Sequence, residues 1–586
     1  MTPPEWRLPF GASLITSDRT SFRLWAPSQQ AISVAIEGRP AAPMSRNDDG
    51  WFEAEVGCGA ATPYRYILQD GIAIPDPASR AQIDKVHGQS LVVDPSSYRW
   101  RNPGWLGRTW HEAVIYELHP GLLGGFAGVA AELPRLANLG ITAVELMPIA
   151  EFPGTRNWGY DGVLPFAPES SYGTPDDLKA LIDVAHDYGL MIFLDVVYNH
   201  FGPDGNYLPL YARLMFRDDL NTPWGPAIDF RQKEVRRFFT ENALYWLIEY
   251  RFDGLRFDAV HAITEADWLD EMAAEVRSRV AGRQIHLVLE NDDNAAGHLA
   301  RDFNAQWNDD GHHVLHVLLT NEHEGYYDDY TEKPAARLAR CLKEGFVYQG
   351  EPSIHRGGKL RGTSSAQLPP TAFVLFLQNH DQIGNRAFGE RLTTLAKPAA
   401  LEAAIALQLL CPQIPLLFMG EEIGSETPFL FFTDHNEELA KAVREGRRRE
   451  FAQFSQFSNP QLLSKISDPN ALATFQQSRP DFARSGKNQR EDLYQRLLVI
   501  RRDTIVPRIP GTRAIDASAI GEAAVMARWR MGDGSLLFLA TNLGPEAVEM
   551  PRSNAEFLYA SSEDAQRGAT KGHIPAYSTI AILSVP

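Results

Sequence analysis

The stretch Gly254-Leu-Arg256-Phe-Asp258 decides the fold, because it places an arginine and a carboxylate at the end of a short apolar run. Three comparable segments occur along the chain: Asp195-Val-Val-Tyr-Asn199-His200, Val288-Leu-Glu290 and Gln378-Asn-His380-Asp381. A carboxylate at the end of a buried strand costs free energy unless it is hydrogen-bonded, paired or used in chemistry. Four such strand ends in one chain predict a polar active site.

Around these segments, from about residue 112 onward, strand patterns alternate with helical patterns. The candidate strands are 113–119, 141–147, 190–197, 252–258, 285–290, 305–309, 372–378 and 414–419. Eight strands that alternate with helices predict an α/β fold, the (β/α)8 barrel, whose active sites lie at the C-terminal ends of the strands. Long connections at 148–174, 198–230 and 420–490 are expected to build a substrate cleft there.

Both ends of the chain have the pattern of antiparallel β-structure. Short alternating runs such as Ile32-Ser-Val-Ala-Ile36 occur before the barrel, and runs such as Ser535-Leu-Leu-Phe-Leu539 occur after it. We therefore expect an N-terminal β-sandwich at 1–105, resembling a carbohydrate-binding module, and a C-terminal β-sandwich at 504–586. The catalytic barrel, with its long cleft loops, is expected between them at 106–503.

The composition indicates a globular protein, with 44% hydrophobic and 22% charged residues. A net charge of −18 argues against a face that binds nucleic acid, which requires clustered Lys and Arg. The three cysteines, Cys58, Cys341 and Cys411, are too few for a disulfide framework or a zinc site. The start of the chain, Met1-Thr-Pro-Pro-Glu-Trp6, lacks the pattern of a signal peptide, and no stretch approaches the roughly 20 apolar residues of a membrane span. We expect a cytoplasmic protein that binds neither nucleic acid nor membrane.

The strand-end residues have the properties that glycosidic bond cleavage with retention requires. Arg256 and Asp258 are two residues apart, so both side chains leave the same face of a strand, and the guanidinium would keep Asp258 ionised. Glu290 follows an apolar run, which favours a raised pKa and a general-acid role. A retaining glycosidase uses one ionised carboxylate as nucleophile and one protonated carboxyl as acid.

In type, order and spacing, these four segments resemble the conserved regions of the α-amylase superfamily of glycoside hydrolases, over roughly residues 110–500. The resemblance implies that Asp258 is the nucleophile, Glu290 the general acid and base, and Asp381 the stabiliser of the transition state. It further implies a set of residues around the glucose that is attacked, with Tyr160, His200, Arg256 and His380 lining its subsite and Asp195 and Asn199 supporting the site.

The equivalent of Asn199 binds calcium in many relatives. The surrounding loop here offers no obvious full set of oxygen ligands, so we expect no required metal and no other cofactor.

Further motifs are similar to those of the superfamily members that hydrolyse maltooligosyl trehalose. They include Trp158-Gly-Tyr-Asp-Gly162, Trp307-Asn-Asp-Asp310, Glu324-Gly-Tyr-Tyr327 and Phe418-Met-Gly-Glu-Glu422. The resemblance implies a retaining hydrolase that cleaves the α-1,4 bond next to the trehalose unit of maltooligosyl trehalose and releases trehalose. It also implies that maltooligosyl trehalose and related α-glucans are the partners. The residues expected to bind this substrate also include Trp307, Asp309, Glu324, Tyr327, Gln382 and Glu422.

Two other functions remain open. A branching or debranching enzyme that acts at α-1,6 branch points would use the same chemistry with different acceptor subsites. A non-catalytic glycan-binding protein could keep the fold, but it would not need to retain all three carboxylates.

Two local points depend on side-chain direction. Glu290 is followed by Asn291-Asp292-Asp293, which is more acidic than usual for this strand end, and the acid assignment would fail if Asp292 pointed inward instead. His312 and His313 are adjacent, and in an extended strand they would point to opposite faces, which argues against a metal-binding pair.

Overall fold

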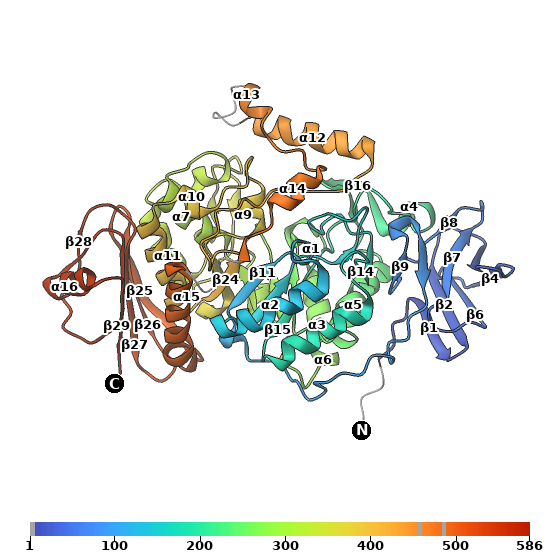
Figure 1. Cartoon of the computed structure of the whole chain (residues 1–586), viewed down its shortest axis with the longest axis horizontal. Helices are drawn as coiled ribbons and strands as arrows, with labels where there is room; N and C mark the ends of the chain where they lie inside the picture. The colour runs from blue at the N-terminus through green and yellow to red at the C-terminus, as the bar shows by residue number, and fades with distance from the viewer. Residues whose placement is uncertain (1–5, 454–459, 483–487, 586) are drawn as a thin grey trace.

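The computed structural model describes residues 6–453, 460–482 and 488–585. A barrel forms the middle of the molecule, and β-sheets lie on either side of it (Figure 1). Residues 1–5, most of the stretch on which the signal-peptide expectation rests, lie outside the described residues.

The central part is a closed barrel of parallel strands, which confirms the predicted fold. In barrel order, the strands are β11 (Ile115–Leu118), β12 (Ala143–Leu146), β15 (Met191–Val196), β18 (Gly254–Phe257), β19 (His286–Leu289), β20 (Ala305–Trp307), β23 (Phe373–Phe376) and β24 (Ile414–Phe418). All the predicted barrel strands are present, each somewhat shorter than expected. In the ladders Asp195 pairs with Arg256, and Arg256 pairs with Val288, so the polar residues that end these strands emerge at one level of the barrel.

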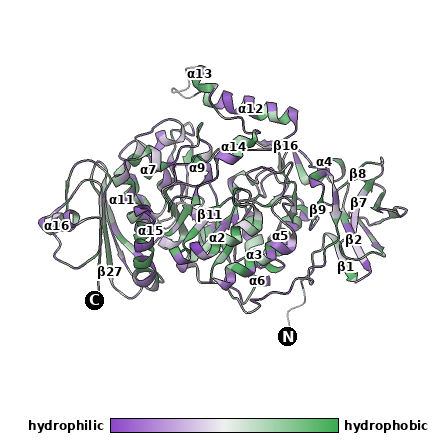
Figure 2. Cartoon of the chain, viewed as in Figure 1, coloured by the Kyte–Doolittle hydropathy of each residue, from purple (hydrophilic) through white to green (hydrophobic). Residues whose placement is uncertain are grey.

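Helices surround this barrel, and their sequences carry both hydrophobic and hydrophilic residues (Figure 2). The main ones are α2 (Gly125–Leu139), α3 (Pro175–Asp187), α5 (Lys233–Ile248), α6 (Asp267–Arg279), α7 (Asp309–Thr320), α8 (Pro334–Glu344), α11 (Pro398–Leu410) and α15 (Gln489–Ile500). Helix α3 shows how the local sequence determines where a helix begins and which side of it is buried. Thr174 accepts a hydrogen bond from the backbone of Asp177, Pro175 occupies the first turn, and Leu178 and Ile182 are buried one turn apart.

The expectation that His312 and His313 lie on an extended strand is wrong, because both belong to helix α7. Strand β20 stops at Trp307, and the Asn308 side chain caps the new helix by accepting a hydrogen bond from Gly311 N at 3.2 Å. Acidic residues in the first turn further stabilise a helix N-terminus. A good capping sequence therefore ended the strand earlier than predicted.

Antiparallel sheets flank the barrel, as predicted. The N-terminal part contains a four-stranded sheet, in the order β1 (Gly11–Thr16), β2 (Arg19–Trp25), β6 (Trp51–Val56), β5 (Ser45–Arg46). A six-stranded sheet beside it is built on β3 (Ile32–Ile36), β7 (Pro63–Leu68) and β10 (Gln89–Leu91). The C-terminal part contains a two-stranded sheet and a five-stranded sheet, the latter in the order β25 (Arg513–Gly521), β26 (Ala524–Arg530), β27 (Leu536–Asn542), β31 (Ser578–Ser584), β29 (Phe557–Ala560). The domain boundaries at 105 and 503 stay predictions.

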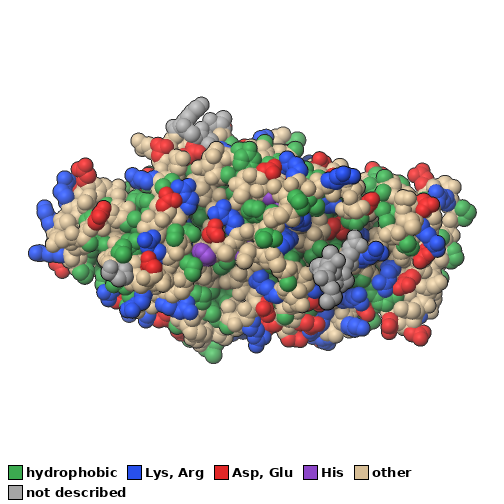
Figure 3. Space-filling view, turned by 90° about the horizontal axis from the view of Figure 1, so that it is seen from below, with side chains coloured by type: hydrophobic (Ala, Val, Ile, Leu, Met, Phe, Trp, Pro, Cys, Tyr) green, Lys and Arg blue, Asp and Glu red, His purple; other side chains and the backbone are tan. Residues whose placement is uncertain are grey.

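The segment after β24 forms much of the structure above the barrel in Figure 1. Helix α12 (Glu437–Phe451) is strongly hydrophilic (Figure 2), and Phe451 at its end is buried. In the face seen in Figure 3, acidic and basic side chains are interspersed. Within the described ranges, no helix is both long and apolar enough to cross a membrane.

Candidate active site

A pocket of about 490 Å³ lies at the C-terminal end of the barrel strands. Its walls include Asp258 and Glu290, which directly follow β18 and β19, and Asp381, which lies in the short helix α9 (His380–Gly384) after β23. The structure thus brings together the three carboxylates that the sequence pointed to, in the place where barrel enzymes hold their catalytic groups.

Arg256 on β18 is the fully buried centre of this site. Its Nη1 donates to Asp195 Oδ2 at 2.6 Å and to Asp258 Oδ1 at 2.9 Å, and its Nη2 donates to Glu290 Oε2 at 2.6 Å. One guanidinium therefore holds the carboxyl groups of Asp258 and Glu290 close together, since adjacent nitrogens of the same planar group bind them.

Glu290 points inward. Besides Arg256, the backbone N–H of Ala259 donates to its Oε2 at 2.8 Å. Burial raises the pKa of Glu290 well above its usual range, and the negative charges of Asp258 and Asp381 add to the effect, although Arg256 opposes it. A carboxyl group in this state is protonated near neutral pH, as a general acid must be.

Asp292, the alternative acid, is unsuited to that role. It forms ion pairs with Arg356 and Arg361, and the Arg361 pair measures 2.9 Å. Burial alone would raise the pKa of Asp292, but the two arginines outweigh it and lower the pKa. Asp292 therefore stays ionised.

Asp258 is held on its other side by Asn199. The Asn199 side chain donates to Asp258 Oδ2 at 2.7 Å and to its backbone carbonyl at 2.8 Å. These two contacts and the bond from Arg256 orient the carboxylate of Asp258, while 8% of the residue stays exposed to the pocket. Asn199 thus supports the carboxylate directly.

Tyr160, His200 and His380 form the wall beside Asp258. The Tyr160 hydroxyl donates to Asp195 Oδ2 at 2.6 Å and lies 2.8 Å from His380 Nε2, and the two rings stack at a centroid distance of 5.1 Å. His200 Nε2 lies 2.9 Å from the Tyr160 carbonyl oxygen. A sugar ring above Asp258 would therefore meet a wall of fixed aromatic and imidazole groups.

Asp381 is the most exposed of the three carboxylates. His380 Nε2 lies 3.4 Å from its Oδ1, and Asn385 Nδ2 donates to the same oxygen at 3.2 Å. Burial would raise the pKa of Asp381, but the charge of His380 and its hydrogen bond outweigh this and lower the pKa. Asp381 is therefore an ionised hydrogen-bond acceptor in the wall of the pocket.

Glu117 on β11 is a residue that the sequence analysis missed. It is buried, it is bonded to Nδ1 of His380, and its Oε2 accepts the His380 backbone N–H at 3.2 Å. The anionic neighbours Asp381 and Glu117 raise the pKa of His380 well above its usual range, although burial opposes them. Glu117 ends an apolar strand like the other carboxylates, so the same reasoning applied to the first strand would have found it.

Two of the expected substrate contacts are buried and do not line the pocket of the three carboxylates. Glu422 is fully buried, its carboxylate lies 3.0 Å from the Tyr116 hydroxyl, and it pairs with Arg135 at 2.9 Å. Trp307 is only 1% exposed, and its ring lies 4.2 Å below the guanidinium carbon of Arg256. Trp307 therefore packs against Arg256 instead of lining the pocket, and Glu422 pairs with Arg135 away from it. Motif similarity alone does not distinguish a residue that touches substrate from one that is buried.

The other expected contacts divide between two pockets. Asp309 and Gln382 line the pocket of the three carboxylates, and burial together with Asp292 raises the pKa of Asp309 to about 7. Glu324 and Tyr327 line a neighbouring pocket instead.

The wall on the side of Glu290 contains further residues that the sequence analysis did not propose. His261 follows β18, and Arg356 and Arg361 come from the hairpin of β21 (Glu351–Pro352) and β22 (Leu360–Arg361). No motif marks this hairpin, and only the folded chain brings it to the pocket.

Among the residues that the structure describes, no group of three or more His, Cys, Asp or Glu side chains is arranged to hold a metal ion. The side-chain amide of Asn199 instead donates a hydrogen bond to Asp258. The absence of a metal requirement stays a prediction.

Two parts of the chain match known protein families. Residues 84–209 match the family described as alpha amylase, catalytic domain, and residues 512–580 match a family described as a domain of unknown function. The malto-oligosyltrehalose trehalohydrolase of Deinococcus radiodurans is 41% identical, over 83% of this chain and 81% of its own length. The enzyme of the same name from a Rhizobium species is 37% identical, over 95% of this chain and 96% of its own.

A crystal structure from Salmonella typhimurium, assigned as an alpha amylase, superimposes with a TM-score of 0.92 at 43% identity, covering 99% of this chain and 100% of that one. A 1,4-alpha-glucan branching enzyme from Thiobacillus denitrificans is 33% identical, but over only 49% of this chain and 44% of its own length.

Proposed function

We propose, from the premise that the chain belongs to the malto-oligosyltrehalose trehalohydrolase family, that it is a retaining glycosidase. It cleaves the α-1,4 bond next to the trehalose unit of maltooligosyl trehalose and releases trehalose. The observation that carries this proposal is that the guanidinium of Arg256 forms hydrogen bonds to both Asp258 and Glu290.

These hydrogen bonds support retention of configuration at the anomeric carbon. Retaining glycosidases hold their two carboxyl groups about 5 Å apart, too close to admit a water molecule between nucleophile and sugar. Two carboxyl groups that bind adjacent nitrogens of one guanidinium are compatible with this spacing.

In the first step, an Asp258 oxygen attacks the anomeric carbon while Glu290 gives its proton to the departing glycosidic oxygen. Trehalose leaves, and the glucan chain stays bound to Asp258 through an ester. In the second step, Glu290 takes a proton from water, whose oxygen attacks the same carbon and frees Asp258. Asp381 holds ring hydroxyls while the sugar distorts, which lowers the barrier of both steps.

Trehalose is the leaving group, and it must lie next to Glu290, the residue that protonates it. The wall of the pocket beside Glu290 therefore recognises trehalose. His261, Asp309 and Arg356 line that wall, and they offer charged donors and acceptors to hydroxyl groups. Trehalose, joined through both anomeric carbons, presents a kinked outline that a linear maltosyl end lacks. We propose that this wall selects it.

A branching or debranching activity is the alternative. The 33% identity to a branching enzyme over 49% of this chain speaks for shared chemistry rather than for the same product.

Product analysis tests the proposal. Maltooligosyl trehalose, unmodified maltooligosaccharide and a branched glucan are each incubated with the full chain, and the products are separated by chromatography. We expect free trehalose from the first substrate and much slower cleavage of the other two. The Asp258→Asn variant, which keeps the size of the side chain but lacks the nucleophile, should release none. Glucose and maltose without trehalose, or new α-1,6 linkages, would refute the proposal.

We also propose a cytoplasmic location, and maltooligosyl trehalose and related α-glucans as partners, with no binding of nucleic acid or membrane. The described cysteines are free and buried, which suits a reducing compartment.

A further inference from the structure

A hairpin of the N-terminal sheets contacts two long connections of the barrel, 148–174 and 198–230, the first and second cleft loops. Both loops contribute residues to the active-site pocket. The hairpin consists of β9 (Gln82–Ile83) and β10, and β9 lies next to β14 (Leu164–Pro168) of the first loop in Figure 1. Lys85 at its tip has a φ angle of 66°, in the left-handed region that residues other than glycine rarely adopt. Such a backbone persists where surrounding contacts fix it, and the cleft loops provide those contacts.

Lys85 lies against two buried carboxylates of the first cleft loop. Its ammonium group pairs with Glu169, which follows β14, and lies 3.8 Å from Oε1 of Glu151 on β13 (Ala150–Glu151). Both glutamate side chains are fully buried, so water does not screen their charges from each other. Burial and the charge of Glu169 raise the pKa of Glu151 to about 8, and the charge of Lys85 opposes this shift. The lysine therefore offsets the repulsion between the two carboxylates.

The two glutamates join β13 to β14 at the base of their hairpin. Glu169 Oε2 accepts the backbone N–H of Phe152, just after β13, at 3.1 Å. Glu151 Oε2 accepts the backbone N–H of Ser170, shortly after β14, at 2.7 Å. Each carboxylate thus binds the end of the strand opposite its own. Because the turn between these strands carries Tyr160 into the active-site pocket, a change in the distance between the carboxylates shifts both ends of that turn.

The next two residues of the hairpin contact both cleft loops. Val86 is 1% exposed and packs against Val163 of the first loop. It also lies so close to Gly205 of the second loop that a Cβ atom there would come within 2.5 Å of Val86 Cγ2. His87 Nδ1 lies 2.7 Å from the hydroxyl of Tyr207, also on the second loop. Three consecutive residues therefore join the two loops to the N-terminal sheets.

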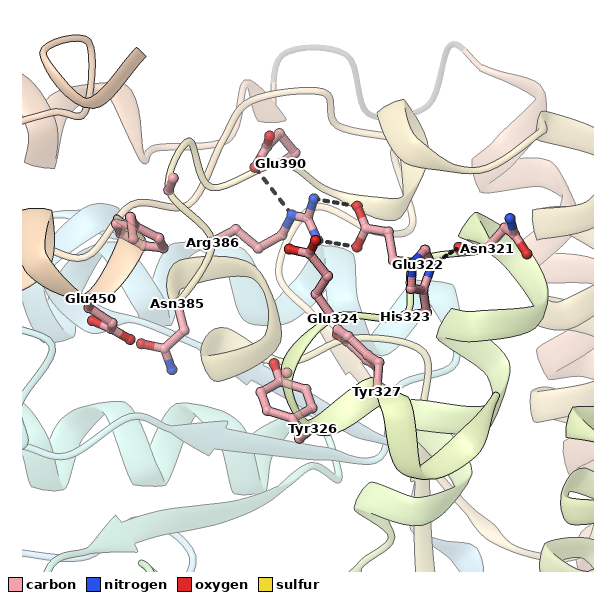
Figure 4. Close-up of a pocket in the computed structure, with 13 residues that line it drawn as sticks. Asn321, Glu322, His323, Glu324, Tyr326, Tyr327, Asn385, Arg386, Glu390 and Glu450 are labelled. Atoms are coloured by element: carbon pink, nitrogen blue, oxygen red, sulfur yellow. Dashed lines mark hydrogen bonds and ion pairs between the residues drawn. The ribbon is translucent and has the colours of Figure 1, made fainter. Parts of the chain in front are cut away.

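The joined loops form one particular wall of the active site. The Tyr160 carbonyl oxygen of the first loop lies 2.9 Å from His200 Nε2 of the second, and both side chains line the pocket beside Asp258. The neighbouring pocket in Figure 4 is lined by residues between 321 and 451, which belong to neither loop. The contacts of the hairpin therefore bear on the wall that faces the attacked sugar.

We propose that Lys85 is a positioning residue, which holds Tyr160 against the glucose unit that Asp258 attacks. The inference rests on the proposed function, because it takes Asp258 as the nucleophile. The N-terminal sheets then contribute to catalysis without touching the substrate. Lys85 keeps the two ends of the Tyr160 turn together, and Val86 fixes that turn relative to the second cleft loop.

Steady-state kinetics of Lys85→Met tests this role, because methionine is also long and unbranched but carries no charge. We expect kcat/KM to fall roughly 10- to 10²-fold, mostly through kcat, since a displaced wall costs alignment in the transition state rather than binding of the glucan. Lys85→Arg, which keeps the cation, should recover most of this loss. A kcat/KM of Lys85→Met equal to that of the wild type would overturn the inference.

Lys179→Met is the matched control. Lys179 on α3 is also a buried lysine that binds the N-terminal part of the chain, since it donates to the Pro95 carbonyl oxygen at 3.4 Å, but it touches neither Glu151 nor Glu169 in any ion pair of the described residues. Its kcat/KM should match that of the wild type. A loss as large as that of Lys85→Met would mean that any loosening of the N-terminal part lowers activity, and the specific role of Lys85 would be refuted.

A double-mutant cycle with Tyr160→Ala separates positioning from a purely structural role. Lys85→Met should lower the unfolding temperature in both backgrounds, but it should lower kcat/KM only where Tyr160 is present. Equal losses of activity in the two backgrounds would contradict the inference. Val86→Ala, a smaller change at the same tip, should show the same dependence on Tyr160, and it decides the question if Lys85→Met does not fold.

An aryl maltooligoside as second substrate separates this inference from the proposed function. Its leaving group needs no recognition of trehalose, whereas its glucan part still meets Tyr160, so Lys85→Met should lower kcat/KM on it as well. If the wild type cleaves this substrate but releases no trehalose from maltooligosyl trehalose, the proposed function fails, and a loss in Lys85→Met still supports the positioning role. Aryl cleavage that Lys85→Met leaves unchanged refutes that role whatever the trehalose result.

Discussion

Arg256 binds both Asp258 and Glu290, but the other neighbours of the two carboxyl groups differ. Asp258 also accepts two hydrogen bonds from Asn199, one of them through its carboxylate, whereas Glu290 lies near the charges of Asp258, Asp381 and Asp309. Hydrogen bonds favour an ionised carboxylate, and like charges in buried surroundings disfavour it. These different surroundings support the proposed roles of Asp258 as nucleophile and Glu290 as acid.

The Glu290→Gln variant tests this division at the level of one residue. The amide cannot donate the proton to a sugar leaving group, so activity on maltooligosyl trehalose should fall by about 10²-fold or more. Because the raised pKa of Glu290 keeps it protonated at neutral pH, wild-type activity should be lost as the pH rises through that pKa.

A substrate whose leaving group departs without protonation gives the control, and the variant should regain part of its activity on it. Rates are measured across pH for both proteins and both substrates. Equal losses on the two substrates would show that Glu290 is not the acid.

Single residues also show how far sequence reasoning reaches. Asp258, Glu290 and Asp381 could be found because each ends an apolar strand, where a charge is costly without a purpose. Glu422 and Trp307 belong to equally specific motifs, yet the fold buries them behind the site. Burial depends on packing between distant segments, such as Arg135 against Glu422, and no local pattern encodes it.

At the scale of elements, neighbouring strands carry the geometry of the site. Glu117 on β11 pairs in register with Glu145 on β12, yet the two carboxyl groups differ in their environment. Glu117 binds His380, whereas both carboxyl oxygens of Glu145 are buried without a hydrogen bond, and burial followed by the charge of Glu117 raises the pKa of Glu145 well above its usual range. Glu145 is therefore neutral, and the anionic support of His380 comes from Glu117.

Glu117→Gln should accordingly lower the pKa of His380, because it removes an anion from a buried cation. The cationic form, which lies against Tyr160 and Asp381, would be lost at a lower pH than in the wild type. The alkaline limb of the kcat/KM profile should therefore move to lower pH, costing about tenfold at alkaline pH for each pKa unit.

Glu145→Gln is the matched control, since it changes a buried carboxyl on the next strand that is already neutral. Its pH profile should coincide with that of the wild type. If the alkaline limb of the Glu117→Gln profile also stays at the pH of the wild type, the charge of Glu117 does not set the pKa of His380.

The barrel strands and the short strands of the hairpin differed in how well they could be predicted from the sequence. Most of the barrel strands follow from apolar runs of suitable length, which depend on local sequence alone, whereas the sixth, β20 (Ala305–Trp307), is short and begins a polar stretch. The 351–361 hairpin, which brings Arg356 to the active site, has two-residue strands that make no sequence pattern. Its position depends on ion pairs with Asp292 and Asp293, contacts that exist only in the folded chain.

At the scale of the whole molecule, buried polar contacts attach the flanking sheets to the barrel. The Thr579 hydroxyl on β31 donates to the Ala403 carbonyl oxygen of α11 at 2.8 Å. On the other side, Arg80 lies 3.2 Å from the carboxylate of Glu249, just after α5, and donates to the Ala12 carbonyl oxygen of β1 at 2.8 Å. Arg80 and Glu249 are each about 6% exposed, so neither charge can be solvated if the other is removed.

Arg80→Ala should therefore loosen the N-terminal sheets from the barrel. Removing one partner of a buried ion pair costs about 3–5 kcal/mol, because the remaining charge stays buried without its partner. We expect a lower unfolding temperature in calorimetry, with trehalose release at room temperature retained, since Arg80 lies outside the active-site pocket. Arg213→Ala is the control, because its pair with Asp218 is 72% and 76% exposed, and exposed pairs contribute about 0–1 kcal/mol. If the two variants unfolded at the same temperature, the Arg80 pair would not hold the sheets to the barrel, and that attachment would rest on apolar packing alone.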